Sequence, residues 1–272
     1  MSRLSPLFVL LLSGCWPMIP GKWADYDVPD ETQIVGSFNY FQPLGGYWGD
    51  PTPNGAVAWG WLDTPQVGLQ AVEPRVGCEV VDPADAGDPL DFVDIGATDA
   101  RMRSSLGTID LAFSADAKLF YNQDLTEDDA GAGVSWTLDN IDSDEGTFHV
   151  QTFVVMPPRL AFGGFSLEGD VPDSIARADY PVTWQAEPGA DWVVLQLQLE
   201  TSQSITETAL CYAEVGDGAI TVPQSIWSKM DTADGMYVYL GSSHETATKI
   251  EGVYGASRMA SVWYQVGYVR FE

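Results

Sequence analysis

The sequence has few of the residues on which nucleic-acid-binding proteins depend. Lys and Arg together number 12 against 39 Asp and Glu, which gives a formal net charge of -27. Phosphate backbones are bound through clustered Lys and Arg side chains. The charge therefore excludes nucleic acid as a natural partner and disfavours direct adsorption to anionic lipid headgroups.

Catalytic motifs are also scarce, and the chain has only 2 histidines. His149 alternates with apolar residues in a predicted strand, and His244 lies in the polar stretch GSSHETAT, which predicts a turn. No G-x-S-x-G or H-E-x-x-H pattern accompanies either one. Carboxylates are numerous enough to supply a glycosidase pair, but almost every Asp lies in a turn-like stretch, where it caps local backbone. We predict a protein that is not an enzyme.

The opening segment is too short to cross a membrane. The apolar stretch from Leu4 to Leu12 follows a single positive charge, Arg3. It is far shorter than the roughly 20 residues of a transmembrane helix. A basic residue, an apolar segment and then small residues are the order of a secretory signal, so this segment predicts export.

The end of this segment, Leu12-Ser13-Gly14-Cys15, resembles the lipobox of bacterial lipoproteins. The resemblance implies that residues 1–14 are a signal peptide and that Cys15 is lipidated and becomes the first mature residue. Several acyl chains anchor a protein far more firmly than one. Because Trp16 and not Asp follows, the resemblance implies the outer membrane of a Gram-negative cell, on its periplasmic or cell-surface face, with the lipid on Cys15 as the membrane contact.

Cysteine is rare as well, with 3 in the chain. Once Cys15 is assigned to lipid, Cys78 and Cys211 remain. An oxidising compartment permits a disulfide between them, and their strand-like surroundings equally suit buried free thiols, so both alternatives stay open. If formed, the bond would contribute roughly 4 to 5 kcal/mol in the chain-entropy model. Neither has a His or Cys at metal spacing, so we expect no zinc site.

The sequence contains many short segments in which polar and apolar residues alternate. In DWVVLQLQLE, Val193, Leu195 and Leu197 alternate with Gln196 and Gln198, which predicts one core face and one solvent-facing side. The same period of two occurs in GTIDLAF, TFHVQTFVV, GMYVYLG and SVWYQVGYVRF. One short helix is expected in PQSIWSKM. The pattern predicts an all-β chain of antiparallel sheets packed as sandwiches.

Two domains are predicted behind the anchor. Residues 15–33 are rich in Pro and Asp, which predicts a flexible tether between the lipid and the folded body. A Pro-Pro pair at 157 and 158 ends a strand, and alternation does not resume strongly until Val182, which predicts a boundary near residue 160. The predicted sandwich domains are residues 34–160 and residues 161–272. One continuous body is the alternative.

The carboxyl-terminal half resembles a module of uncharacterised Gram-negative lipoproteins. The resemblance rests on YPVTW, WVVLQLQLE and CYAEVGDGAITVPQSIW, within residues 181–227, and is looser in the amino-terminal half. It implies an immunoglobulin-like or fibronectin-like sandwich. It implies architecture and no catalytic residues.

An acidic stretch offers a calcium hypothesis. DNIDSDEGT places Asn140, Asp142 and Asp144 at alternate positions, as calcium loops do. The glycine and the closing glutamate of the twelve-residue calcium loop are not at the required positions. A solvated hairpin tip is therefore the alternative to a calcium site.

Aromatic residues offer a second hypothesis. Tyr47 and Trp48 lie in the loop-like stretch YFQPLGGYW, where exposed rings would stack on sugars or anchor a protein partner. Trp59 and Trp61 share one face of a predicted strand, for which core packing is the expected role. We expect a non-catalytic, lipid-anchored cell-envelope protein with a binding or structural role. The alternative is a carbohydrate-binding or glycan-active surface lipoprotein; calcium is compatible with both, and no other cofactor is expected.

Overall fold

The computed structural model describes residues 33–44, 55–62, 76–81, 99–114, 119–122, 124–139, 141–143, 146–148, 152–168, 173–201, 204–228, 235–249 and 256–272. These segments are mostly β-strand, with two short α-helices, α2 (Glu127–Ala130) and α3 (Gln224–Trp227). The prediction of an all-β chain is confirmed. The helix expected in PQSIWSKM is α3, and Pro223 is its N-cap.

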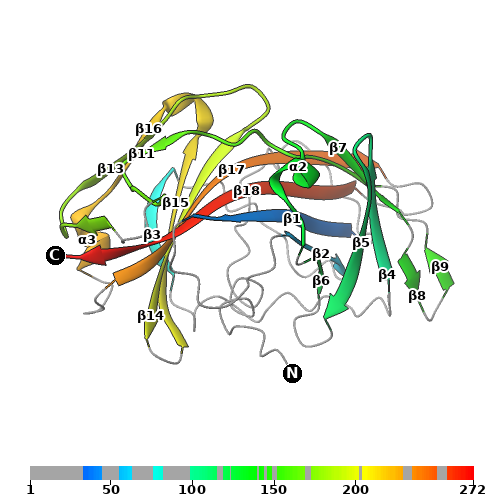
Figure 1. Ribbon diagram of the computed structural model, residues 1–272, viewed down its shortest axis with the longest axis horizontal. Coiled ribbons are helices and arrows are strands. Elements are labelled where there is room, and N and C mark those ends of the chain that lie inside the picture. The colour runs from blue at the N-terminus through cyan, green and yellow to red at the C-terminus, as the bar shows by residue number, and fades with distance from the viewer. Residues whose placement is uncertain are drawn as a thin grey trace.

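One large sheet takes most of the strands (Figure 1). Its members are β1 (Gln33–Pro43), β2 (Gly55–Leu62), β3 (Gly77–Val81), β4 (Asp99–Ser104), β5 (Gly107–Ser114), β6 (Leu119–Asn122), β7 (Ser135–Asp139), β10 (Thr152–Val155), β12 (Asp173–Ile175), β14 (Trp192–Thr201), β15 (Ser204–Glu214), β17 (Gly235–Lys249) and β18 (Ala256–Phe271). The hydrogen-bonded order is β10-β7-β4-β5-β6-β2-β1-β18-β17-β14-β15-β3, and β12 also pairs with β18. Figure 1 shows β1, β17 and β18 crossing the middle of the molecule.

A second, smaller sheet covers part of one face of the large sheet. It consists of β11 (Phe162–Gly163), β13 (Tyr180–Trp184) and β16 (Ala219–Val222). Val182 and Val222 from this sheet share one buried core with Leu195, Leu197 and Leu240 from the large sheet. Two sheets with a common apolar core between them form a sandwich layer, as the sequence pattern predicts. A separate hairpin joins β8 (Ile141–Ser143) and β9 (Gly146–Phe148).

The boundary predicted near residue 160 does not separate two sheets. β1 pairs in parallel with β18, from Ile34 opposite Ser257 to Pro43 opposite Val266. β3 pairs with β15, also across the predicted boundary. Most other neighbours are antiparallel, and the parallel β1–β18 pair joins the two halves of the chain. Strands from both halves of the chain therefore share one hydrogen-bonded sheet, and the division into two domains stays a prediction.

The solvent-facing side predicted for β14 is buried, so that part of the prediction is wrong. Gln196 and Gln198 are each 1% exposed, and their neighbour Val194 is 0% exposed. β14 lies between β15 and β17 inside the large sheet, where both faces of a strand can be covered. The alternation correctly placed neighbouring side chains on opposite faces of the strand. The presence of glutamine side chains, however, did not show that the second face is exposed to solvent.

The turn predicted at GSSHETAT is also wrong. This stretch continues β17, which stays paired with β18 as far as Lys249 opposite Ala256. Ser242 and Ser243 are buried, and His244 is half-buried. Pairing with neighbouring strands stabilises an extended conformation that the local polar composition does not favour.

Candidate functional site

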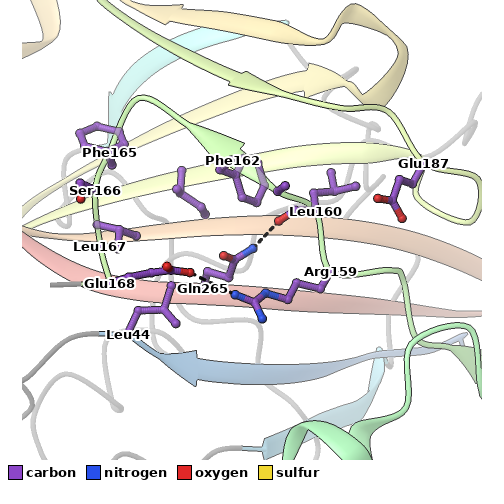
Figure 2. A pocket seen from close by; sticks show the side chains of 12 residues that line it. Leu44, Arg159, Leu160, Phe162, Phe165, Ser166, Leu167, Glu168, Glu187 and Gln265 are labelled. Carbon is purple, nitrogen blue, oxygen red and sulfur yellow. Dashed lines mark hydrogen bonds and ion pairs between the residues drawn. The ribbon is translucent and has the colours of Figure 1, made fainter.

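A pocket of about 450 Å³ lies where the segment 159–168 crosses β17 and β18 (Figure 2). This volume is within the range of small-molecule sites. Its apolar lining is Leu44, Leu160, Ala161, Phe162, Phe165, Leu167 and Leu240. Its polar lining is Arg159, Ser166, Glu168, Glu187 and Gln265.

Side chains of the large sheet hold the segment that forms one wall of the pocket. Ser242 Oγ donates to the carbonyl oxygen of Pro158 at 2.6 Å, and Gln265 Nε2 donates to that of Leu160 at 2.6 Å. Pro157 and Pro158 have no backbone N–H, so this stretch cannot pair fully as a strand. Its carbonyl oxygens therefore accept hydrogen bonds from side chains, and the segment stands off the sheet far enough to leave a pocket.

A chain of polar groups leads to one end of the pocket. Trp263 Nε1 donates to Gln42 Oε1 at 3.3 Å, and Gln42 Nε2 donates to Glu127 Oε2 at 2.8 Å. Arg159 lies between Glu127 and Glu168, with N–O distances of 3.7 Å and 3.4 Å. Both distances are longer than the roughly 2.7–2.9 Å of a close charge-assisted bond. The arginine is thus held by two carboxylates, on α2 and on its own segment.

Tyr40 packs beside this chain of polar groups, and its hydroxyl stays uncharged at neutral pH. Burial, with a further contribution from Glu127, raises the pKa of Tyr40 to about 12. The Tyr40 ring packs edge-on against Trp263, with 4.9 Å between centroids. Glu127 begins α2, whose N-cap Thr126 and third helical residue Asp129 form a capping box. The hydrogen bonds from Thr126 lower the pKa of Asp129.

Two acceptor groups of the pocket are not used by the described residues. Glu187 is exposed and makes no hydrogen bond or ion pair with any residue in the described ranges. Gln265 is 6% exposed and uses its amide nitrogen on Leu160, while its amide oxygen accepts no hydrogen bond from a described residue. Figure 2 shows Glu187 and Gln265 on different sides of the pocket, with Leu160 between them in this view.

The lining contains no histidine and no cysteine, and its groups with catalytic potential are the hydroxyl of Ser166 and the carboxylates of Glu168 and Glu187. Within the part of the chain that the structure describes, no group of three or more His, Cys, Asp or Glu is placed to hold a metal ion. The arrangement offers an apolar surface, hydrogen-bond acceptors and one neutralised arginine.

The structure joins Cys78 and Cys211 by a disulfide. The two residues are directly opposite each other in β3 and β15 and are separated by 133 positions in sequence. β3 is the last strand at this side of the large sheet. The bond therefore fixes an edge strand to its only neighbour in the sheet order.

Other predicted site residues lie outside the described residues or away from the pocket. Cys15, Tyr47, Trp48, Asn140, Asp144 and His149 are outside the described ranges. Asp142 is in β8, at one end of the molecule in Figure 1. The calcium site and the stacking site stay predictions. Trp59 and Trp61 are in β2, opposite Gly36 and Ile34 of β1.

His244, which the sequence leaves without a role, lies beside a carboxylate. Its Nδ1 is 2.9 Å from Asp191 Oδ2. His244 is on β17 and Asp191 directly precedes β14, so the pair links adjacent strands of the large sheet. Neither residue lines the pocket.

Sequence reasoning missed the pocket residues Arg159, Glu187 and Gln265. The signal that was present is the Pro-Pro pair followed directly by Arg159, because two residues without N–H groups keep the following segment out of a sheet. Glu187 and Gln265 carry no comparable local signal. Only the complete fold brings these two residues to the same pocket.

Comparison with known proteins gives little further information. No protein-family model matches the chain, and no curated protein matches it. Among solved structures, the chain is similar to the FN1–FN3 domains of chicken CNTN1, with 10% sequence identity and a TM-score of 0.19. The similarity covers 86% of this chain and 68% of that one. A likeness at this level carries no functional inference. No helix among the described residues is both long and apolar enough to span a membrane.

Proposed function

We propose that this chain is a non-catalytic, lipid-anchored protein of the bacterial cell envelope that binds its ligand or partner in the pocket beside Arg159. The observation that carries this proposal is the pocket itself. It combines an apolar lining with acceptor groups that no described residue uses.

The anchor part of the proposal rests on the lipobox-like end of the amino-terminal segment. Cys15 would carry the lipid, and residues 15–33 would connect it to the folded body. The Cys78–Cys211 disulfide is compatible with export, because such bonds persist in oxidising compartments. The outer membrane is the proposed location, with the chain on its periplasmic or cell-surface face.

The proposal is tested with full-length protein extracted from cells in mild detergent and measured by native mass spectrometry. Wild-type protein is expected to carry an acyl mass and a second, non-covalent ligand mass. Cys15→Ser should lose the acyl mass. Ala161→Trp should lose the ligand mass, because Ala161 is exposed and lines the pocket, and the indole ring would fill that space.

Ala219→Trp is the matched control for the pocket variant. Ala219 is also exposed and lies on β16, outside the pocket lining. Loss of the ligand mass in both tryptophan variants, or in neither, would contradict the proposed site. Acylation that persists in Cys15→Ser would contradict the anchor.

A carbohydrate-binding or glycan-active surface lipoprotein is the second candidate. The observation that favours it is that half-buried Phe162 lines the same pocket as the carboxylates of Glu168 and Glu187. A ring beside hydrogen-bonding carboxylates is a common way to hold a sugar. Titration with chitohexaose and maltohexaose tests it: binding abolished by Phe162→Ala supports this candidate, and heat signals indistinguishable from buffer would remove it.

A further inference from the structure

We propose that the ligand of the pocket is an organic cation: an ammonium group on an apolar stem, with a hydrogen-bond donor at the other end. This inference rests on the proposed function and deepens it. It follows from three properties of the pocket: its unmatched charge, its unused acceptors and its apolar surface.

The unmatched charge is negative. Arg159 supplies the positive charge of the lining, and Glu127 and Glu168 approach it from two sides. Glu187 makes no ion pair with a described residue, so its charge remains for a ligand. The whole chain, at a net charge of -27, adds a negative field that attracts cations and repels anions. An ammonium group beside Glu187 would neutralise this negative charge.

The unused hydrogen-bonding atoms also favour an organic cation as the ligand. The Gln265 side chain is more than nine-tenths buried and lines the pocket, and its amide oxygen accepts no hydrogen bond from a described residue. This oxygen is not among the fully buried atoms without a partner, so it is accessible from the pocket, and a ligand that donates to it would take the place of water. The ammonium group and a distal hydroxyl or N–H supply donors, whereas a carboxylate supplies none.

The walls between these two groups are apolar. Leu160 and Leu240 are buried, and the ring of Phe162 is half-buried beside them. In Figure 2 Leu160 lies between Glu187 and Gln265. A methylene stem running from one to the other would bury its surface on these side chains, and the face of an aromatic ring also attracts a nearby cation.

The test uses three probes that share a six-carbon stem and a terminal hydroxyl: 6-amino-1-hexanol, 1,6-hexanediol and 6-hydroxyhexanoate. Each is titrated calorimetrically at low salt into the full chain carrying Cys15→Ser, which requires no detergent. The aminoalcohol is expected to bind about fivefold more tightly than the diol, as a single exposed ion pair allows. The hydroxy acid is expected to bind most weakly, and added salt should remove the difference between the probes.

Two variants locate the contacts. Glu187→Gln keeps the shape of the side chain and removes its charge, so it should abolish the preference for the aminoalcohol and leave binding of the diol unchanged. Gln265→Met should weaken binding of all three probes, because each carries the terminal hydroxyl. The matched control is Glu214→Gln, because Glu214 is exposed and does not line the pocket; it should leave every affinity unchanged.

The outcomes separate this inference from the proposed function. Equal binding of the aminoalcohol and the diol, or tightest binding of the hydroxy acid, overturns the cation and leaves a binding pocket. The same preference in wild type and Glu187→Gln also overturns the cation site. Both the inference and the proposed function are overturned if none of the three probes binds and if both tryptophan variants keep the native ligand mass.

Discussion

Some side chains in the large sheet are buried without hydrogen-bond partners. Both amide atoms of Gln196, the amide oxygen of Gln198 and the hydroxyl of Ser243 find no hydrogen-bond partner among the described residues, and all three residues are at most 1% exposed. They belong to the paired strands β14 and β17. An unsatisfied buried polar atom costs roughly 1–3 kcal/mol of stability. These residues therefore reduce the stability of the fold.

Replacing such an amide by an apolar group of similar shape should stabilise the protein. We expect Gln196→Met to raise the free energy of unfolding by about 1 kcal/mol, since methionine has a similar length and needs no hydrogen bonds. Urea denaturation of the two proteins measures the difference. Gln224→Met, at an exposed position of α3, is the control and should change stability little. A loss of stability in Gln196→Met would show that the amide is satisfied in solution.

The capping box of α2 makes a pH-dependent contribution. Hydrogen bonds from Thr126 lower the pKa of Asp129 below its ordinary value of 3.8. A carboxyl group whose pKa is lower in the folded state stabilises the protein above its unfolded pKa. That stabilisation is lost as the pH falls through the folded pKa. The window is therefore below about pH 4.

Thr126→Val should remove the side-chain part of this contribution and keep the hydrogen bond from the backbone N–H of residue 126 to Asp129. The pKa of Asp129 should rise towards 3.8, and stability at neutral pH should fall by about 1 kcal/mol, as for other lost N-caps. NMR titration of the carboxyl carbon measures the first, and urea denaturation at several pH values measures the second. Thr221→Val, at an exposed position of β16, is the control. An Asp129 pKa equal in wild type and Thr126→Val would contradict the assigned hydrogen bonds.

At the level of elements, the period of two identified the strands with the strongest alternation. β5, β14 and the end of β18 were predicted, and so was α3. The extension of β17 through polar residues was missed, because pairing with β14 and β18 decides it and local composition does not. The short strands β11 and β12 were missed because each has too few residues to show an alternating pattern.

The Cys78–Cys211 disulfide holds β3 to β15. Replacing both cysteines by alanine should lower the free energy of unfolding by up to about 5 kcal/mol in the chain-entropy model, since the closed loop is long. Hydrogen exchange should also become faster at the β15 amides that pair with β3, between Thr208 and Tyr212. Reduced wild-type protein is the control and should behave like the double variant. Unchanged exchange in both would show that β3 is held without the disulfide.

For the whole molecule, the pairing of β1 with β18 is the feature that the sequence did not reveal. Parallel neighbours more than two hundred residues apart share no local signal, and the register is set by cores that form only in the complete fold. The same limit applies to the pocket, whose lining comes from Leu44 directly after β1, from the segment 159–168, from Glu187 between β13 and β14, and from β17 and β18. The alternation of polar and apolar residues predicted the class of fold. It did not predict which strands meet.

One continuous sheet should unfold as one unit. Calorimetry of the Cys15→Ser chain is expected to give a single transition whose calorimetric and van't Hoff enthalpies agree. The reason is that strands from both sides of residue 160 share hydrogen bonds in the large sheet. Two separate transitions would instead favour the division into residues 34–160 and residues 161–272.

We propose that the pocket beside Arg159 is where this protein binds its ligand in the cell envelope. The most direct measurement places a photo-crosslinking amino acid at position 161 in living cells, with position 219 as the control, and determines the mass of the adduct in the membrane fraction. We predict one discrete adduct at position 161, bearing an amine, and none at position 219. The same set of adducts at both positions, or none at position 161, would contradict the account.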